Sequence, residues 1–231
     1  MRRALLALTA ALLLAGCFGG PPPGPEWRLR AADASQRYYH AMLAGDRQRA
    51  ASNLARALEA ASRSDDLTVL ARVHLGRAAM HLALLRDPDL ARSDELLELA
   101  GDPALHAYRR FLAGQPGARD ADRLPPGLGL PARRLRADKP RALAEAVQAI
   151  GEPRRRLVAA AVAHRRYPRK RAFTDIAVDA ASQEGWRAVL LAWLPVQAEA
   201  AERAGESAEA AAIRDRLRWL RDPVAGRPGA G

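Results

Sequence analysis

The sequence predicts an all-α protein. Ala, Leu and Arg dominate its 231 residues, aromatic residues make up only 5%, and β-branched residues are few. Ala, Leu and Arg rank at the top of the helix-propensity scale, so this composition favours helices over strands. From Ala31 onward apolar residues recur at helical spacing, and no segment shows the sustained alternation of a strand. We therefore expect antiparallel helical hairpins packed as an α-solenoid or a helical bundle.

Start and stop signals place the individual helices. Side chains that accept a hydrogen bond from a free backbone N–H mark helix starts, and a following Pro suits the first helical position. Such signals are Ser64-Asp65-Asp66, Asp87-Pro88, Asp102-Pro103 and Thr174-Asp175. Glycines that suit a left-handed helix end are Gly101, Gly151 and Gly205. The predicted helices span 31–44, 47–62, 66–86, 88–100, 103–113, 139–150, 153–166, 173–183, 186–204 and 206–221.

A Gly- and Pro-rich break at 114–132 divides the helices into an N-terminal region, 31–113, and a C-terminal region, 133–222. The break is long for a connection inside a compact domain, which leaves two interpretations, a subdomain boundary or a functional loop. Its apolar residues, Leu124, Leu128 and Leu130, predict that part of it packs on the body. Residues 223–231 are expected to be a disordered tail.

One apolar stripe stands out in the C-terminal region. Trp186, Val189, Leu190, Trp193 and Leu194 follow helical spacing, which favours a core helix. A groove for a partner, lined by Trp186 or Trp193, is the alternative. Pro195 falls inside this helix, where it removes one backbone hydrogen bond and predicts a kink.

Two segments resemble tetratricopeptide repeats. Gly45-Asp46 followed by Ala50, Leu54 and Ala57-Leu58 is similar to the turn and second helix of such a repeat, and Gly205-Glu206 followed by Ala210 repeats the spacing. Leu75-Gly76 looks like part of a first-helix signature. Tyr38 departs from the family, which has a small residue there, and no 34-residue register joins the two matches. Generic packing of helical hairpins remains the alternative.

The N-terminus carries export signals. Arg2-Arg3 and a short apolar run form a secretory signal over residues 1–16 that is too short to span a membrane. Leu14-Ala15-Gly16-Cys17 resembles the lipobox of bacterial lipoproteins, which implies cleavage before Cys17 and acylation of it. Residues 17–30 then hold the lipidated Cys and a Gly/Pro tether. In bacteria that use the Asp-retention rule, Phe18 in place of Asp implies delivery to the outer membrane, facing the periplasm. In a host with one membrane, the same anchor implies the outer face of that membrane.

The net charge of +11 is concentrated in one segment. Residues 133–171 hold thirteen basic and three acidic side chains. The candidate anion- or partner-binding residues fall in three groups, Arg133, Arg134, Arg136 and Lys139, then Arg154, Arg155 and Arg156, then Arg165, Arg166, Arg169, Lys170 and Arg171. The middle group opposes the helix dipole at an N-terminus, which hints at an external anion. A solvated face with no specific partner is the alternative.

The sequence shows no catalytic or metal-binding pattern. The five histidines, His40, His74, His81, His106 and His164, lack metal-ligand spacing, and no nucleophile elbow or phosphate loop occurs. Glu206-Ser207 resembles the catalytic Glu-Ser pair of lytic transglycosylases, although a carboxylate in a first helical turn is expected on dipole grounds alone. We expect neither a catalytic residue nor a cofactor.

These observations together predict a non-catalytic, lipid-anchored envelope protein. Lipoproteins with tetratricopeptide bodies commonly act as adaptors, so the resemblance implies a helical scaffold for a protein partner in envelope assembly. Two alternatives remain open, a protein that binds anionic lipid or glycan phosphate, such as lipopolysaccharide, through residues 133–171, and a cell-wall-modifying enzyme. The export signal argues against a nucleic-acid partner despite the basic charge.

Overall fold

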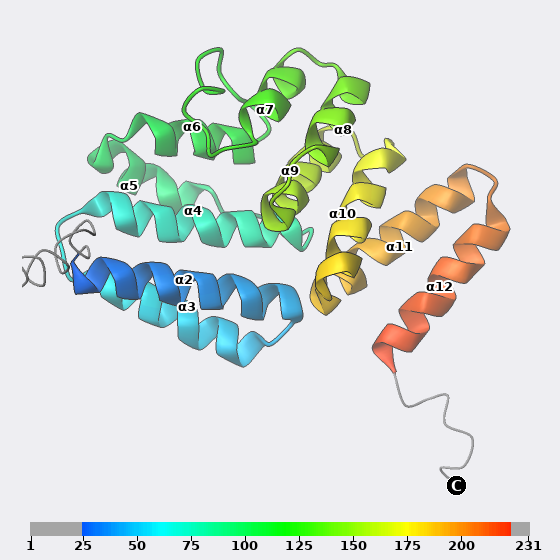
Figure 1. The fold of residues 1–231 in the computed structure, drawn as a ribbon, viewed down its shortest axis with the longest axis horizontal. Helices are drawn as coiled ribbons and strands as arrows, with labels where there is room; N and C mark the ends of the chain where they lie inside the picture. Colours follow the sequence, from blue (N-terminus) through cyan, green and yellow to red (C-terminus); the bar gives the residue numbers. More distant parts are fainter. Residues whose placement is uncertain (1–24, 223–231) are drawn as a thin grey trace, which may run out of the picture.

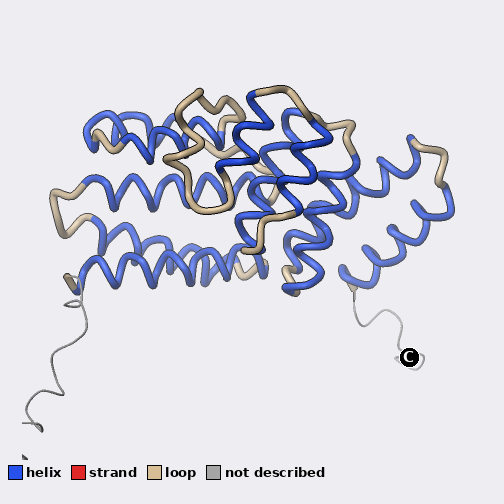
Figure 2. Tube along the Cα trace, turned by 45° about the horizontal axis from the view of Figure 1, so that its top comes forward, coloured by secondary structure: helices blue, strands red, loops and turns tan. Residues whose placement is uncertain are grey.

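A computed structural model describes residues 25–222, and within that range the chain folds into eleven helices without a strand. The predicted all-α class is confirmed, and Figure 2 shows helices joined mostly by short loops, with one long loop between α6 and α7. The helices of the N-terminal region are α2 (Glu26–Ala44), α3 (Arg47–Ala61), α4 (Leu67–Ala83), α5 (Ala91–Ala100) and α6 (Pro103–Leu112). Those of the C-terminal region are α7 (Gly129–Arg136), α8 (Pro140–Gln148), α9 (Pro153–Arg166), α10 (Arg171–Glu184), α11 (Arg187–Arg203) and α12 (Ser207–Arg221).

The helices form an array of hairpins. In Figure 1 α4, α5 and α6 lie above the α2–α3 hairpin, α7 to α10 follow toward the right, and the α11–α12 hairpin closes the right-hand end; α11 also contacts α2. Gly45 ends α2 with a φ of 94° and Gly205 follows α11 with a φ of 80°, so both hairpin turns use a left-handed glycine. Over residues 25–222, no helix has both the length and the apolar character needed to cross a membrane.

Side-chain caps account for several of the helix starts. Asp66 accepts a hydrogen bond from the Thr68 N–H at 3.1 Å, and Asp102 accepts one from the Ala104 N–H at 2.8 Å. Each carboxylate satisfies a backbone donor that has no partner inside its own helix. The helix starts predicted at these two positions are therefore confirmed.

Three predicted boundary signals are wrong. The helix expected from Pro88 begins at Ala91, because Asp89 takes a left-handed φ of 47° and turns the chain before it. Thr174-Asp175 is not a start, since both residues lie inside α10. Gly151 does not adopt the left-handed conformation, whereas Gly185, which the sequence did not indicate, ends α10 with a φ of 68°.

Two helical segments extend beyond the prediction. α2 begins at Glu26, so the last five residues of the expected tether 17–30 are helical. No helix was predicted at α7, which covers the end of the expected break and the four residues after it; Pro131 falls in its first turn, where Pro is tolerated. Leu128, Ala132 and Leu135 are buried at helical spacing along this segment, and their burial orients it on the body.

The break packs on the body only in part. Leu128 is 1% exposed and Leu124 is half-buried against the core, but Leu130, also expected to pack, is 43% exposed. A Cβ on Gly129 would stand 2.5 Å from the Ala121 carbonyl oxygen, so a residue without a side chain lets the loop approach α7 closely. Residues 114–128 thus form a loop seated against the helices.

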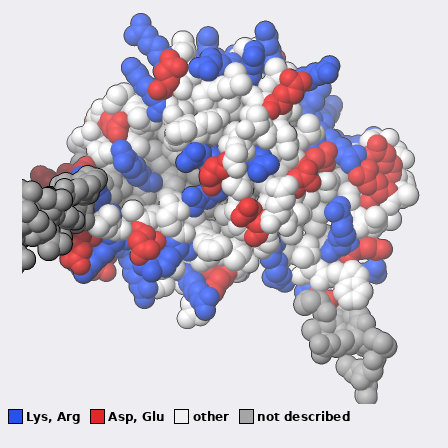
Figure 3. Space-filling model, in the orientation of Figure 1, with Lys and Arg blue, Asp and Glu red and all other residues white. Residues whose placement is uncertain are grey.

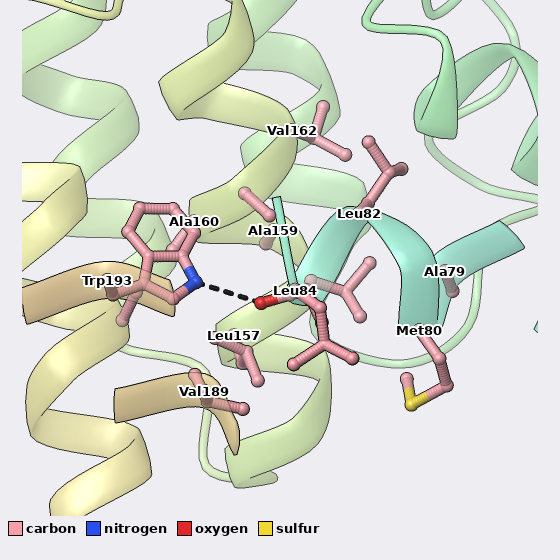
Figure 4. Close-up of a cluster of buried hydrophobic side chains, with 14 of the residues drawn as sticks. Ala79, Met80, Leu82, Leu84, Leu157, Ala159, Ala160, Val162, Val189 and Trp193 are labelled. Carbon is pink, nitrogen blue, oxygen red and sulfur yellow. Dashed lines mark hydrogen bonds between the residues drawn. The ribbon is translucent and has the colours of Figure 1, made fainter. Parts of the chain in front are cut away.

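One hydrophobic core joins the regions on either side of that loop. It runs from Tyr38 on α2 to Leu217 on α12 and includes the expected stripe on α11. Trp193 is fully buried, and its Nε1–H donates to the Ala83 carbonyl oxygen at 2.8 Å (Figure 4). The core interpretation of this stripe is confirmed, because Trp193 has no surface left for a partner. α11 remains helical through Pro195.

Candidate functional site

The structure brings together the first and third of the three basic groups. The Tyr167 hydroxyl donates to Asp138 Oδ1 at 2.5 Å, and Arg166 Nη2 lies 4.0 Å from the same oxygen. Asp138 follows α7 with a φ of 52°, a left-handed conformation that Asp tolerates better than most residues. These contacts hold the α7–α8 turn against the α9–α10 turn. We call the basic residues of the two turns the basic edge: Arg133, Arg134, Arg136, Lys139, Arg165, Arg166, Arg169 and Lys170.

Most of the basic edge is free of acidic partners. Arg133 approaches Asp122 at 3.4 Å, and Arg166 approaches Asp138. The remaining six residues form no ion pair with any described residue, and all of them except half-buried Arg134 are exposed. In Figure 3, Lys and Arg side chains line the upper margin of the molecule, over α7 and α8. The structure therefore presents an edge of largely uncompensated positive charge.

Arg171 does not join this edge. Its guanidinium contacts Asp175 at 3.2 Å and also pairs with Glu206 and Glu209, which ties α10 to α12. The hydrogen bond from Arg171 lowers the pKa of Glu209. The same contacts occupy Glu206, the residue of the transglycosylase-like pair, in an ion pair. Arg171 thus acts as a link between helices.

The middle basic group lies at the opposite end of α9, about 20 Å from the third group by the rise of a 14-residue helix. Glu152 caps this end by accepting hydrogen bonds from the Arg154 and Arg155 N–H groups at 3.2 and 2.8 Å. Its carboxylate also lies 3.8 and 3.6 Å from their guanidinium groups. The unfavourable dipole expected from the sequence is therefore compensated inside the chain, so it does not require an external anion.

Arg154 and Arg155 border a pocket of about 450 Å³ between α4, α6, α9 and the 114–128 loop. Its apolar lining includes Leu75, Ala79, Met80, Leu105, Leu128 and Val158. Arg72 and Arg123 complete a border of four arginines, and Glu152 is the one carboxylate that lines the pocket. Figure 3 shows charged side chains of both signs near the middle of this face, between α4 and α9.

Two tyrosines form part of the pocket wall. Tyr39 lies across Gly76, where a Cβ would stand only 1.9 Å from the Tyr39 hydroxyl oxygen. The Arg154 guanidinium lies 5.0 Å from the centre of the Tyr39 ring and donates to Gln36 Oε1 at 2.7 Å. Burial raises the pKa of Tyr39 and of Tyr108, so both hydroxyls stay protonated at neutral pH.

Sequence reasoning found only part of this pocket. It singled out Arg154 and Arg155, but not Tyr39, Arg72 or Tyr108. The sequence pointed to Arg123 only through its place in the segment 114–132, for which a functional loop was one of the two interpretations. Arg156, the third member of the middle group, does not line the pocket, and its buried Nε atom has no hydrogen-bond partner.

The histidines and acidic residues do not converge on a metal. Among residues 25–222, no group of three or more His, Cys, Asp or Glu side chains is arranged to hold an ion. His81 Nδ1 lies 3.0 Å from the Asp87 carbonyl oxygen, and His164 meets the Trp193 ring edge-on at 5.1 Å. These two rings serve local packing within the helical array.

Comparison with known proteins finds no matching family model, no matching curated protein and no matching solved structure. The lipidation expected at Cys17, the signal at 1–16 and the tail at 223–231 lie outside the described residues. The basic edge and the arginine-bordered pocket are therefore the structural features from which a function can be argued.

Proposed function

We propose that the protein is a non-catalytic helical scaffold of the bacterial envelope, anchored by lipidated Cys17. In this proposal the basic edge lies against anionic lipid headgroups on the periplasmic side of the outer membrane; lipopolysaccharide phosphates are an alternative anionic ligand of the same edge. The hairpin array then presents its other faces to a protein partner in envelope assembly. The partner is not a nucleic acid, because the signal at 1–16 directs the chain out of the cytoplasm.

The observation that carries this proposal is the convergence of six unpaired cations on the basic edge. Each basic residue near an anionic membrane contributes about 1 kcal/mol of attraction. A polybasic surface adds electrostatic attraction to the acyl chains of a lipid anchor and turns one face of the anchored body toward the membrane. The six cations therefore suit a protein that is already held close to a membrane.

Chain geometry limits how far the helical body can lie from the anchor. Eight residues separate Cys17 from Glu26, where α2 begins, so the nine steps between them span at most about 32 Å at about 3.5 Å per residue. The helical body therefore stays close to the anchor. The Debye length at physiological salt is about 8 Å, which is short compared with this distance. The membrane therefore attracts strongly only those charges of the body that face it closely.

A vesicle flotation experiment tests the membrane role. The mature chain with Cys17→Ser removes the lipid anchor and isolates the contribution of the body. We expect it to float with vesicles of anionic phospholipid at low salt and to be released as the salt concentration rises. The edge variant changes five exposed cations to Gln, namely Arg136, Lys139, Arg165, Arg169 and Lys170.

A matched control separates the basic edge from net charge. It changes five other exposed arginines without ion pairs to Gln, namely Arg47, Arg56, Arg86, Arg92 and Arg119. The control should retain most of the binding, whereas the edge variant should lose it. Equal losses of vesicle binding in the two variants would show that binding depends on total charge alone. That result would contradict the proposed membrane face.

In-cell crosslinking with mass spectrometry tests the scaffold role. One protein partner recovered with both the intact protein and the edge variant would support an adaptor whose basic edge serves membrane attraction. Loss of all specific crosslinks in the folded edge variant would instead make this edge the recognition site. Turnover of purified wall fragments that Glu206→Gln abolishes would overturn the non-catalytic proposal.

A further inference from the structure

The pocket between α4, α6, α9 and the 114–128 loop combines two properties that a hairpin interface does not need. Its floor is aliphatic, and its border carries four arginines. Its volume of about 450 Å³ lies within the roughly 300–1,000 Å³ typical of ligand-binding pockets. Other hollows between described helices have comparable volumes of about 320–550 Å³, so the lining and not the volume distinguishes this pocket.

Positive charge exceeds negative charge around the opening. Glu152 approaches both Arg154 and Arg155, and Asp102 lies 3.5 Å from Arg72. Arg123 is exposed and forms no ion pair with any described residue. Two carboxylates thus face four guanidinium groups, which leaves a net positive border. Planar guanidinium groups match the geometry of a carboxylate or phosphate better than that of any other common ligand group.

Three residues hold one of these guanidinium groups in place. Gly76 has no side chain, so the Tyr39 ring can lie across α4, and Arg154 stacks over that ring at 5.0 Å. The bond from Arg154 to Gln36 fixes the guanidinium from the other side. Because the Arg154 side chain is already held in place, less side-chain entropy is lost when a ligand binds.

Beside the Tyr39 and Tyr108 rings of the wall, the buried lining is aliphatic and flexible, which suits an alkyl chain. Leu75, Ala79, Leu105 and Val158 are aliphatic, and Met80 has a flexible thioether that adapts to a chain of variable shape. We propose that this pocket binds a single-chain amphiphile, with its acyl chain on the aliphatic floor and a carboxylate or phosphate head at the arginine border. The proposal is independent of the membrane role of the basic edge, which lies at the other end of α9.

Calorimetric titration of the mature chain tests this proposal. The probes are dodecanoate and dodecyl phosphate, both below their critical micelle concentrations, with dodecyltrimethylammonium as a cation of equal chain length. We expect saturable binding of one equivalent of each anionic probe and at least tenfold weaker binding of the cation. Tighter binding of dodecyl phosphate would identify a phosphate head, and tighter binding of dodecanoate would identify a free fatty acid.

Variants locate the bound probe. Arg123→Gln and Arg154→Gln should each weaken the anionic probes at least threefold, and the pair together about tenfold. Arg56→Gln removes one exposed charge from α3, which contributes no residue to the pocket, and should leave affinity unchanged. Ala104→Trp places a large ring in the half-buried mouth of the pocket and should abolish binding.

Several outcomes would overturn the proposal. Equal binding of the cationic probe would show that the arginines do not select the head group, and equal losses in Arg56→Gln and Arg154→Gln would show a nonspecific charge effect. Binding that resists both Ala104→Trp and the double arginine variant would place the probe elsewhere. Absence of saturable binding to the lipidated protein and to its Cys17→Ser variant would refute the site. Binding to the Cys17→Ser variant alone would instead support the site, because it would show that the protein's own acyl chain fills the pocket of the lipidated protein.

Discussion

Replacing Trp193 with Phe should destabilise the whole molecule, because this side chain joins the two regions on either side of the 114–128 loop. Its Nε1–H donates to the Ala83 carbonyl oxygen, which lies at the C-terminal end of α4 and has no partner within that helix (Figure 4). Phe lacks the donor and would leave this buried oxygen unpaired, at a cost of about 1–3 kcal/mol. The smaller ring also removes apolar contact worth about 1 kcal/mol, comparable to one buried methylene group.

The combined loss of about 2–4 kcal/mol is a large part of the 5–15 kcal/mol that stabilises a typical domain. With a urea dependence of about 3 kcal/mol per molar, the unfolding midpoint should fall by roughly 1 M. Circular dichroism at 222 nm measures this midpoint without relying on tryptophan emission. Because one core spans both regions, the variant should still unfold in a single transition.

Trp219→Phe is the matched control, since Trp219 is 52% exposed on α12 and should tolerate the change within about 0.5 kcal/mol. A Trp193→Phe midpoint within 0.2 M of the parent would refute the argument that this hydrogen bond is important for stability. An equal loss in Trp219→Phe would attribute the effect to tryptophan removal in general.

Three further predictions concern other parts of the chain. Burial lowers the pKa of His164, His74 and His81 in the folded protein, so protonation of these rings favours the unfolded state. Their contribution to stability is therefore fully present above the unfolded pKa of about 6.5 and is lost as the pH falls toward the folded pKa values. The urea midpoint should therefore drop between pH 7.5 and 5.0, with a smaller drop in His164→Gln, and a midpoint constant over this range would contradict the prediction. Asp120, 2% exposed, accepts two hydrogen bonds from Arg110 and one from the Gly117 N–H, so Asp120→Asn should cost about 1–3 kcal/mol in a urea titration. Asp94→Asn at the more exposed pair with Arg109 should cost less than about 1 kcal/mol, and equal losses would argue against a special role for burial. Finally, Cys17→Ser should move the protein out of the membrane fraction, and unchanged fractionation would overturn the anchor assignment.

Helix positions were predictable because their determinants are local. Asp66 and Asp102 each cap a backbone N–H two residues away, and the Gly45 and Gly205 turns follow from the need for a left-handed residue. Interactions of this range are visible in the linear sequence. The missed α7 shows where local reasoning failed, since Pro131 is typical of a helix break unless the burial of Leu128, Ala132 and Leu135 shows that it lies in a first turn.

The candidate sites depended instead on packing. Asp138 and Tyr167 are 29 residues apart, yet their hydrogen bond unites two basic groups in one edge. Arg154 reaches Gln36 across 118 residues, and Tyr39 covers Gly76 on another helix. No periodicity encodes which turns become neighbours, so the pocket and its border could not be assembled from the charge pattern alone.

The sequence by itself determined the all-α class, the resemblance to an exported lipoprotein and the concentration of positive charge in residues 133–171. The tertiary structure decided which of those charges remain available. Glu152 compensates the middle group at the α9 N-terminus, and three carboxylates occupy Arg171, while six cations of the basic edge remain unpaired. The physical reason is that helix formation depends on neighbours within one or two turns, whereas the neutralisation of a charge depends on side chains that only folding brings within a few ångströms.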